Sequence, residues 1–192
     1  ADRGESRPVV RDGRQDVVAE NRVEHPRRKP QPGRVHAAEP MGRPEAAVSA
    51  QQHGLWVWSR LFPRCPAYNV TAVLDLDRRV DVRRLESAVN ALARRHPPPR
   101  TVFRRSLDQA QRHVHAAGEA GAAVRTGYGE AVVTEVLDRL FEPEVLPRLA
   151  IGVRRRTGGS GDTVLLAIDH LVADQRSLDL VLAELADLYA GR

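Results

Sequence analysis

The sequence is poor in cysteine and in long apolar runs, and each shortage excludes a class of protein. Cys65 is the only cysteine, so the chain holds no internal disulfide framework and no cysteine zinc site. No run approaches the roughly 18 apolar residues of a membrane span, and the N-terminus lacks the apolar core of a signal peptide. We therefore expect a cytoplasmic protein with no membrane partner.

Lysine and aromatic residues are also scarce. The formal net charge is +5, and almost all of the positive charge comes from arginine because Lys29 is the only lysine. A basic total raises the question of a nucleic-acid partner. The arginines are scattered among acids, however, and aromatic residues make up only 4% of the chain, so no stacking platform or recognition helix can be traced. The sequence therefore disfavours a nucleic-acid partner.

The composition changes near residue 46. Residues 1–46 are crowded with arginine, proline, glycine and acidic residues, and they have neither helical nor strand periodicity. Such a segment buries too little apolar surface to offset the entropy lost on ordering, so we expect residues 1–46 to be disordered. Residues 47–192 contain the apolar periodicity of a folded unit, and we expect them to form one.

Three stretches in the first part of this unit have clear patterns. Ser49 and Gln52 have the form of a capping box, which predicts an amphipathic helix that ends near Pro63. The stretch "PAYNVTAVLDLD" alternates apolar and polar side chains and predicts a strand. Asp81 is the expected N-cap of the next helix, which must stop before the run "PPP" because proline removes amide donors.

The second part of the unit predicts two strand pairs and two helices. The stretches "RTVFRRS" and "QRHVHAA" predict paired strands, as do "PRLAIGVRRR" and "DTVLLAIDH". Residues 118–128 are rich in glycine and alanine and predict a loop. The helix predicted from "GEAVVTEVLDRLF" includes Leu140 on its buried stripe and is broken by Pro143, and Ser177 is the expected N-cap of a last helix. Strands thus alternate with helices, which predicts an α/β fold, a two-layer sandwich with a mixed β-sheet.

The stretch "AIDHLVADQRS" places an ionisable pair where a strand leads into a helix. Residues 163–169 are apolar at nearly every position, which is typical of a strand covered on both faces. His170 therefore emerges at the carboxyl end of a central strand, where open sheets place ligands and chemistry. A neutral imidazole can accept a proton from a nucleophile near working pH, so His170 is the candidate catalytic residue. The alternative is a histidine that only hydrogen-bonds within a loop.

Asp174 has a different expected role. Its unperturbed pKa of about 3.9 makes the carboxylate a poor base at neutral pH. We expect Asp174 to pair with an arginine and so to hold the loop and His170 in place. Two other histidines, His113 and His115, share a strand face, but no third ligand follows at a recognisable spacing, so no metal site is predicted.

Four stretches, in this order, resemble the N-terminal half of the condensation domain of nonribosomal peptide synthetases. The first, "VSAQQHGLWVWSRLFPRCPAYNV", resembles the family's opening pattern, in which a Ser-x-x-Gln helix leads through Leu-Trp to a Pro-x-Tyr-Asn strand. The second, "RHPPPRTVF", resembles Arg-His-Glu-x-Leu-Arg-Thr-x-Phe. The third, "FEPEVLPRLAIGV", resembles a segment in which Phe-Asp-Leu leads to Pro-Leu and a strand. The fourth, "DHLVADQRS", resembles the active-site motif His-His-x-x-x-Asp-Gly followed by Ser.

This resemblance, which runs from about Val48 to Gly191, implies a fold and a chemistry. The fold is that of chloramphenicol acetyltransferase, and the reaction forms an amide between a thioester donor and an amine acceptor. The resemblance implies no directly bound cofactor, because the substrates are carried on the phosphopantetheine of carrier proteins, which are the expected partners. The second histidine of the motif is catalytic in the family and matches His170. The motif's aspartate matches Asp174 and is held by an arginine, for which we prefer Arg100 to Arg95.

The chain departs from the family pattern at three places. Asp169 stands where the motif has its first histidine, Gln175 stands where it has glycine, and "PPP" replaces Glu-x-Leu. A carboxylate next to His170 favours the imidazolium form. Asp169 is therefore counted, with Asp174 and Arg100, among the residues that support the site.

The resemblance covers one lobe of a two-lobed domain whose active site lies in the channel between the lobes. Acyl transfer needs both substrates held together, so we expect this lobe to be incomplete or inactive alone. Its expected partners include the missing C-terminal lobe or a second copy of itself. The alternative function is a noncatalytic module that binds a carrier protein or a synthetase partner through an exposed apolar face.

Overall fold

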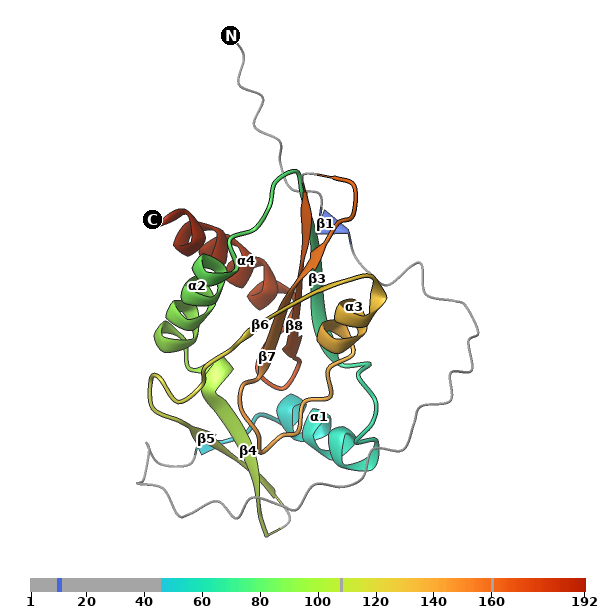
Figure 1. The fold of residues 1–192 in the computed structure, drawn as a ribbon. Helices are drawn as coiled ribbons and strands as arrows, with labels where there is room; N and C mark the ends of the chain where they lie inside the picture. The colour runs from blue at the N-terminus through green and yellow to red at the C-terminus, as the bar shows by residue number, and fades with distance from the viewer. Residues whose placement is uncertain (1–9, 12–45, 108, 160) are drawn as a thin grey trace, which may run out of the picture.

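The computed structural model describes residues 10–11, 46–107, 109–159 and 161–192, and within them it has the mixed α/β architecture that the sequence predicts (Figure 1). The elements, in chain order, are β1 Val10–Arg11, β2 Ala46–Ala47, α1 Ala50–Leu61, β3 Asn69–Leu76, α2 Val82–Arg95, a 3-10 turn Pro98–Arg100, β4 Thr101–Ser106, β5 Gln109–Val114, β6 Val124–Tyr128, α3 Glu130–Leu137, β7 Leu149–Arg155, β8 Asp162–Asp169 and α4 Gln175–Ala190. The predicted disorder of residues 1–46 lies outside the described residues, apart from β1 and Ala46. None of the described helices is long and apolar enough to span a membrane.

The strands form a larger mixed sheet and a smaller antiparallel one. The larger sheet has the order β1-β3-β8-β7-β6, with β6 and β7 parallel and the other neighbours antiparallel. The smaller sheet has the order β2-β5-β4 and contains the predicted pair of strands on either side of Leu107. Strand β8 therefore lies in the middle of the larger sheet, between β3 and β7.

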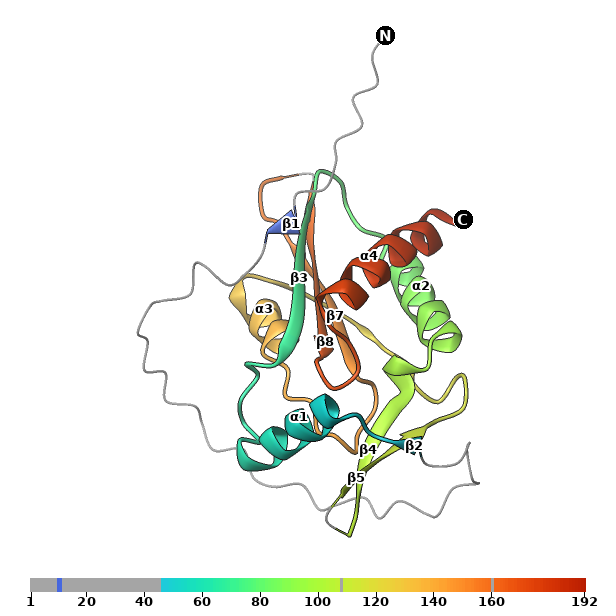
Figure 2. The same ribbon diagram turned by 180° about the vertical axis from the view of Figure 1, so that it is seen from behind.

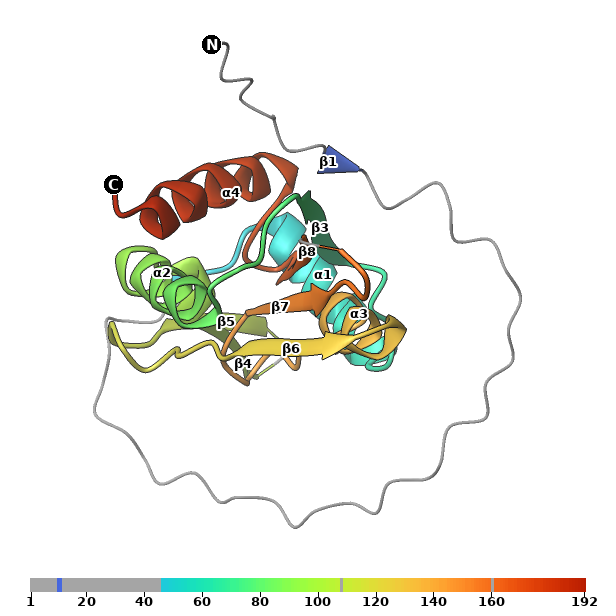
Figure 3. The ribbon, with the colours of Figure 1, turned by 45° about the horizontal axis from the view of Figure 1, so that its top comes forward.

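Helices cover both faces of the larger sheet. Helices α2 and α4 lie side by side on one face, and α3 lies on the other (Figures 1 and 3). Leu166 and Ile168 of β8 pack into the core under α2 and α4, whereas Leu165 packs with Val132 and Val136 of α3. Every residue of β8 is buried, which confirms that this strand is covered on both faces.

Helix α1 lies near the carboxyl end of β8 and next to the smaller sheet (Figure 2). The capping box of Ser49 and Gln52 is present as predicted. The side chain of Gln52 also donates a hydrogen bond to the Leu171 carbonyl at 3.1 Å. The buried Trp56 packs against Phe103 of β4 and Leu171. Helix α1 is thus attached to the turn that follows β8.

Strand β6 corrects the predicted loop at residues 118–128. Residues 124–128 pair in parallel with β7, and the strand lies at the edge of the sheet. Most of its side chains are partly or fully exposed and it contains Gly127, so it lacks the apolar alternation from which a strand is predicted. The neighbouring strand, rather than local preference, holds these residues extended.

Helix α3 ends before Leu140, so the prediction that it reaches Pro143 is wrong. The side-chain nitrogen Nδ2 of Asn69 donates to the carbonyls of Leu137 and Arg139 at 2.9 and 2.8 Å. These bonds satisfy carbonyls that a helix end leaves open, and they turn the chain away from the helix axis. Leu140 is consequently exposed at the surface instead of being buried on a helical stripe.

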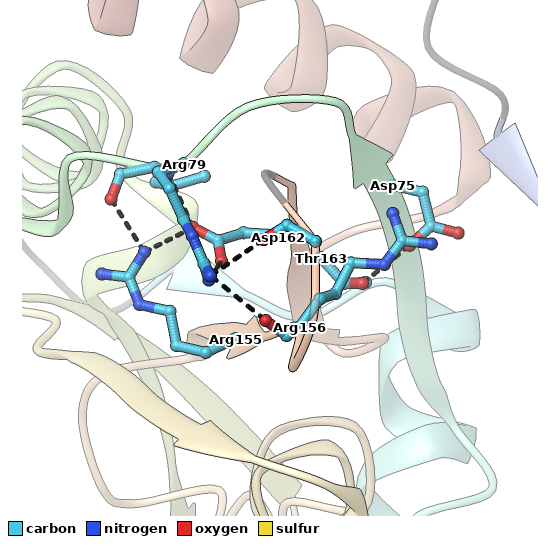
Figure 4. A network of polar contacts seen from close by, with 8 residues as sticks. Asp75, Arg79, Arg155, Arg156, Asp162 and Thr163 are labelled. Carbon is cyan, nitrogen blue, oxygen red and sulfur yellow. Dashed lines mark hydrogen bonds and ion pairs between the residues drawn. The ribbon is translucent and has the colours of Figure 1, made fainter.

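Asp162, the first residue of β8, has a fully buried carboxylate enclosed by donors (Figure 4). It accepts a hydrogen bond from the backbone N–H of Val80 at 2.7 Å and from Arg79 at 2.8 Å, and it forms an ion pair with Arg155. Burial alone would raise the pKa of Asp162, but these hydrogen bonds outweigh it and hold the pKa below its usual value. The cluster joins the β7–β8 hairpin to the start of α2.

We predict that Asp162→Asn lowers the free energy of unfolding by about 3 kcal/mol at neutral pH, because two arginines lose their buried counter-charge. The stabilisation from a depressed pKa is present above the unfolded value of about 3.9 and is lost as the pH falls toward the folded pKa. Urea unfolding between about pH 5 and about pH 3 should therefore show a smaller acid-induced loss for Asp162→Asn than for the wild type. Equal losses in both proteins would contradict the assignment.

Gly152 lets α3 lie directly on β7. A Cβ at this position would lie 2.7 Å from Cγ2 of Val136, which is too close for any side chain. We predict that Gly152→Ala destabilises the fold by about 1–3 kcal/mol through overpacking, and that Val136→Ala costs less in the Gly152→Ala background than in the wild type. Gly54→Ala on α1, where a Cβ meets no atom within 4 Å, is the control and should be neutral or stabilising in the same denaturant titration.

Candidate functional site

His170 follows β8 directly and is partly buried. Its backbone N–H donates to the Tyr68 carbonyl at 3.1 Å. Its Nδ1 lies 2.7 Å from the Ala173 carbonyl oxygen. Because a carbonyl can only accept, Nδ1 carries the proton in the neutral ring, and Nε2 is then the nitrogen that can accept one. The backbone of the turn therefore sets the tautomer of His170.

A small open cavity of about 40 Å³ adjoins His170. A succession of aromatic rings leads to it from α1. The ring centroids of Trp58 and Phe62 are 4.2 Å apart, those of Trp58 and Tyr68 are 5.4 Å apart, and those of Tyr68 and His170 are 6.2 Å apart. Ligand pockets usually measure roughly 300–1,000 Å³. The described residues therefore form an apolar wall beside the imidazole rather than an enclosed pocket.

Asp174 does not form the predicted ion pair with an arginine. It is the N-cap of α4, a role predicted for Ser177, and its Oδ1 accepts hydrogen bonds from the N–H and the hydroxyl of Ser177, both at 2.7 Å. Those two bonds hold the pKa of Asp174 below its usual value. The positive end of the helix dipole and the free N–H groups of the first turn supply what an arginine was expected to supply.

The two arginines proposed as its partners lie elsewhere. Arg100 donates from Nη1 to the His115 carbonyl, at the end of the smaller sheet. Nη1 of Arg95 lies 2.5 Å from Oε1 of Glu184 on α4. Arg100 thus joins the 3-10 turn to the residue that follows β5, and Arg95 joins α2 to α4.

Asp169 is the predicted support residue that the structure brings against the turn that carries His170. It is only 8% exposed, and its Oδ1 accepts the N–H of Leu171 at 2.9 Å. Its other oxygen forms an ion pair with Arg148, a residue that the sequence analysis missed. The available signal was a single arginine in the otherwise apolar stretch "LPRLAIGV", because an arginine buried beside a strand needs a counter-charge.

Arg148 keeps its charge in this setting. Its side chain is fully buried, and burial lowers its pKa from the ordinary value to about 9. A pKa of about 9 leaves the guanidinium protonated at neutral pH, so the contact with Asp169 is an ion pair.

His113 and His115 lie with their ring centroids 4.9 Å apart, and Nδ1 of His115 lies 2.7 Å from a carboxylate oxygen of Glu119. Across the described ranges, no group of three or more histidine, cysteine, aspartate or glutamate side chains is arranged to hold a metal ion.

We predict that Asp174→Ala lowers the thermal midpoint of unfolding, because α4 loses its cap, and that Asp174→Asn lowers it less, since asparagine also caps helices. Adding Arg100→Ala to Asp174→Ala should produce a loss equal to the sum of the two single losses, because the side chains share no contact. The midpoints are measured by differential scanning calorimetry. A loss in the double variant clearly smaller than that sum would indicate that Asp174 and Arg100 do interact.

Comparisons with known proteins match this chain to a family whose members share its sequence pattern. The model of the condensation-domain family matches residues 43–192. CymA of Salinispora arenicola, described as a probable non-canonical nonribosomal peptide synthetase, is 31% identical over 158 residues, which are 81% of this chain and 2% of CymA. Gramicidin S synthase 2 of Brevibacillus brevis is 27% identical over 148 residues, which are 74% of this chain and 3% of the synthase. The chain therefore spans a few per cent of the length of these relatives.

Solved structures share the fold. The starter condensation domain of the rhizomide synthetase RzmA superposes with a TM-score of 0.67 at 15% identity, covering 78% of this chain and 38% of that one. The X-domain from teicoplanin biosynthesis superposes with a TM-score of 0.64 at 23% identity, covering 80% and 35%. The likeness thus corresponds to one lobe of those larger folds. With the family match over residues 43–192, it shows that this chain belongs to the condensation-domain family of nonribosomal peptide synthetases.

Proposed function

We propose that this chain is the histidine-bearing lobe of a condensation domain that forms an amide between a thioester donor and an amine acceptor. Both substrates would arrive on the phosphopantetheine arms of carrier proteins. The observation that carries the proposal is the placement of His170, which emerges from a fully buried strand beside an apolar wall with its Nδ1 held by the Ala173 carbonyl.

The chemistry follows from the tautomer. The amine nitrogen attacks the thioester carbonyl carbon, so that a C–N bond forms and the C–S bond breaks. The proton released by the amine passes to Nε2 of His170 and then to the departing thiolate. The hydrogen bond between Nδ1 and Ala173 strengthens as the ring becomes positive, because a charged donor makes the stronger bond.

The rate of such a reaction depends on holding the two substrates together. The wall formed by Trp58, Phe62 and Tyr68 covers one side of His170. Phe62 and Tyr68 are 48% and 41% exposed, so an apolar surface remains open to a second lobe. We expect little amide formation from this lobe alone.

A noncatalytic binding module is the second candidate, and two observations favour it. The X-domain of teicoplanin biosynthesis, which shares this fold, is known in a complex with OxyB. In this chain the residue before His170 is Asp169, whose charge is paired with Arg148. In this second reading, the lobe binds a carrier protein or a synthetase partner through its surface, and His170 has no part in the binding.

The first proposal is tested by supplying a second condensation-domain lobe in trans and measuring amide formation from carrier-bound thioesters. We predict that His170→Ala lowers the rate by roughly 100- to 10,000-fold, because the transition state loses its proton acceptor. His96→Ala is the matched control. That histidine contacts Glu184 between α2 and α4, away from the cavity, and its loss should leave the rate near that of the wild type.

A reconstituted rate that survives His170→Ala would overturn the catalytic proposal. Carrier binding measured by calorimetry separates the two candidates. Binding that is unchanged by His170→Ala, together with no amide formation from the wild type in any lobe combination, supports the noncatalytic module.

A further inference from the structure

We propose that Arg148 is a positioning residue for this site, because its ion pair with Asp169 connects the turn that carries His170 to the loop that lines the cavity. The inference deepens the proposed function and rests on it for its catalytic meaning. In structural terms, the place and the tautomer of the His170 ring depend on the Arg148–Asp169 pair.

Arg148 organises the loop between α3 and β7. Its Nη1 donates to the carbonyls of Glu142 and Val145, and its guanidinium carbon lies 5.8 Å from the centre of the Phe141 ring. Phe141 lines the cavity beside His170. A single guanidinium therefore holds both the backbone and an aromatic side chain of the cavity wall.

Asp169 organises the turn on the other side of the pair. Its Oδ1 accepts the N–H of Leu171, and its carbonyl accepts the N–H of Val172 at 3.0 Å. Both hydrogen bonds span His170, because Asp169 precedes it in the chain and the two donors, Leu171 and Val172, follow it. A displaced Asp169 carboxylate would therefore reorient the His170 peptide and lengthen the contact between Nδ1 and Ala173.

One member of the pair, Asp169, is also a departure from the family pattern, because it stands where the motif has its first histidine. Its partner Arg148 follows Pro147 in the stretch "FEPEVLPRLAIGV". Either charge alone would be buried without a partner, which is strongly destabilising. Together they form an ion pair, so each charge compensates for the other.

The opposite end of β8 provides a matched control. Asp162 and Asp169 are the first and last residues of the same strand, both are buried, and both are paired with arginine. Figure 4 shows the cluster around Asp162. Arg79 donates to Asp162 and is about half-exposed, so Arg79→Gln weakens that cluster with little risk to folding. Neither Asp162 nor Arg79 lines the cavity.

The experiment records the ring nitrogen signals of His170 in the ¹⁵N-labelled chain, assigned by comparison with His170→Gln. We expect the wild type to show protonated Nδ1 and unprotonated Nε2. In Arg148→Leu the thermal midpoint should fall by about 10 °C. The ring signals should move toward the Nε2–H tautomer that a solvent-exposed imidazole prefers. Arg148→Lys, which keeps the charge but not the planar donor array, should show a partial change and serves if Arg148→Leu does not fold.

The double variant Arg148→Leu with Asp169→His removes both buried charges and places at position 169 the residue type that the family motif has there. It should recover most of the lost midpoint and the Nδ1–H signature, because neither charge is then left unpaired. Arg79→Gln and Asp162→Asn should lower the midpoint without changing the His170 signals.

Two outcomes overturn the inference. One is an unchanged His170 tautomer in both Arg148 variants, and the other is an equal change in the Asp162 and Arg79 controls, which would indicate a global effect. Neither outcome bears on amide formation, so failure here is distinct from failure of the proposed function, which the His170→Ala rate decides.

Discussion

The structure depends on the complete burial of β8, together with the neutralisation of the carboxylates at its two ends. A strand covered on both faces delivers its first and last residues into the protein interior, where an unpaired carboxylate is costly. Asp162 at one end is enclosed by arginines and a backbone N–H, and Asp169 at the other is paired with Arg148. The first cluster closes the β7–β8 hairpin, and the second holds the turn from which the site is built.

The site is a consequence of that strand. His170 is the first residue beyond β8. Its amide donates to the Tyr68 carbonyl, which lies before β3, and its Nδ1 is held by the Ala173 carbonyl within the turn. On one side of the ring lie the aromatic residues of α1 and of the segment before β3. The other side stays open, which agrees with a fold that matches one lobe of larger condensation-domain structures.

Patterns that act over a few residues were predictable. The capping box of Ser49 and Gln52, the Asp81 cap and the buried course of β8 are present as expected, because each depends on hydrogen bonds or periodicity within one segment. The end of α3 was not predictable in this way, because it is set by the side chain of Asn69, 68 positions earlier in the chain. Strand β6 likewise exists because β7 offers it hydrogen bonds.

The sequence alone determined which histidine emerges from the central strand and that Asp169 and Gln175 replace the usual residues around it. Only the tertiary structure decided which arginine meets which carboxylate. The chain has 30 lysine and arginine residues and 25 aspartate and glutamate residues, so composition permits many pairings. Residue type alone does not distinguish Arg95, Arg100 and Arg148 as partners of the motif's carboxylates. Burial made the choice, because an ion pair is strong and specific only where the fold removes both groups from water.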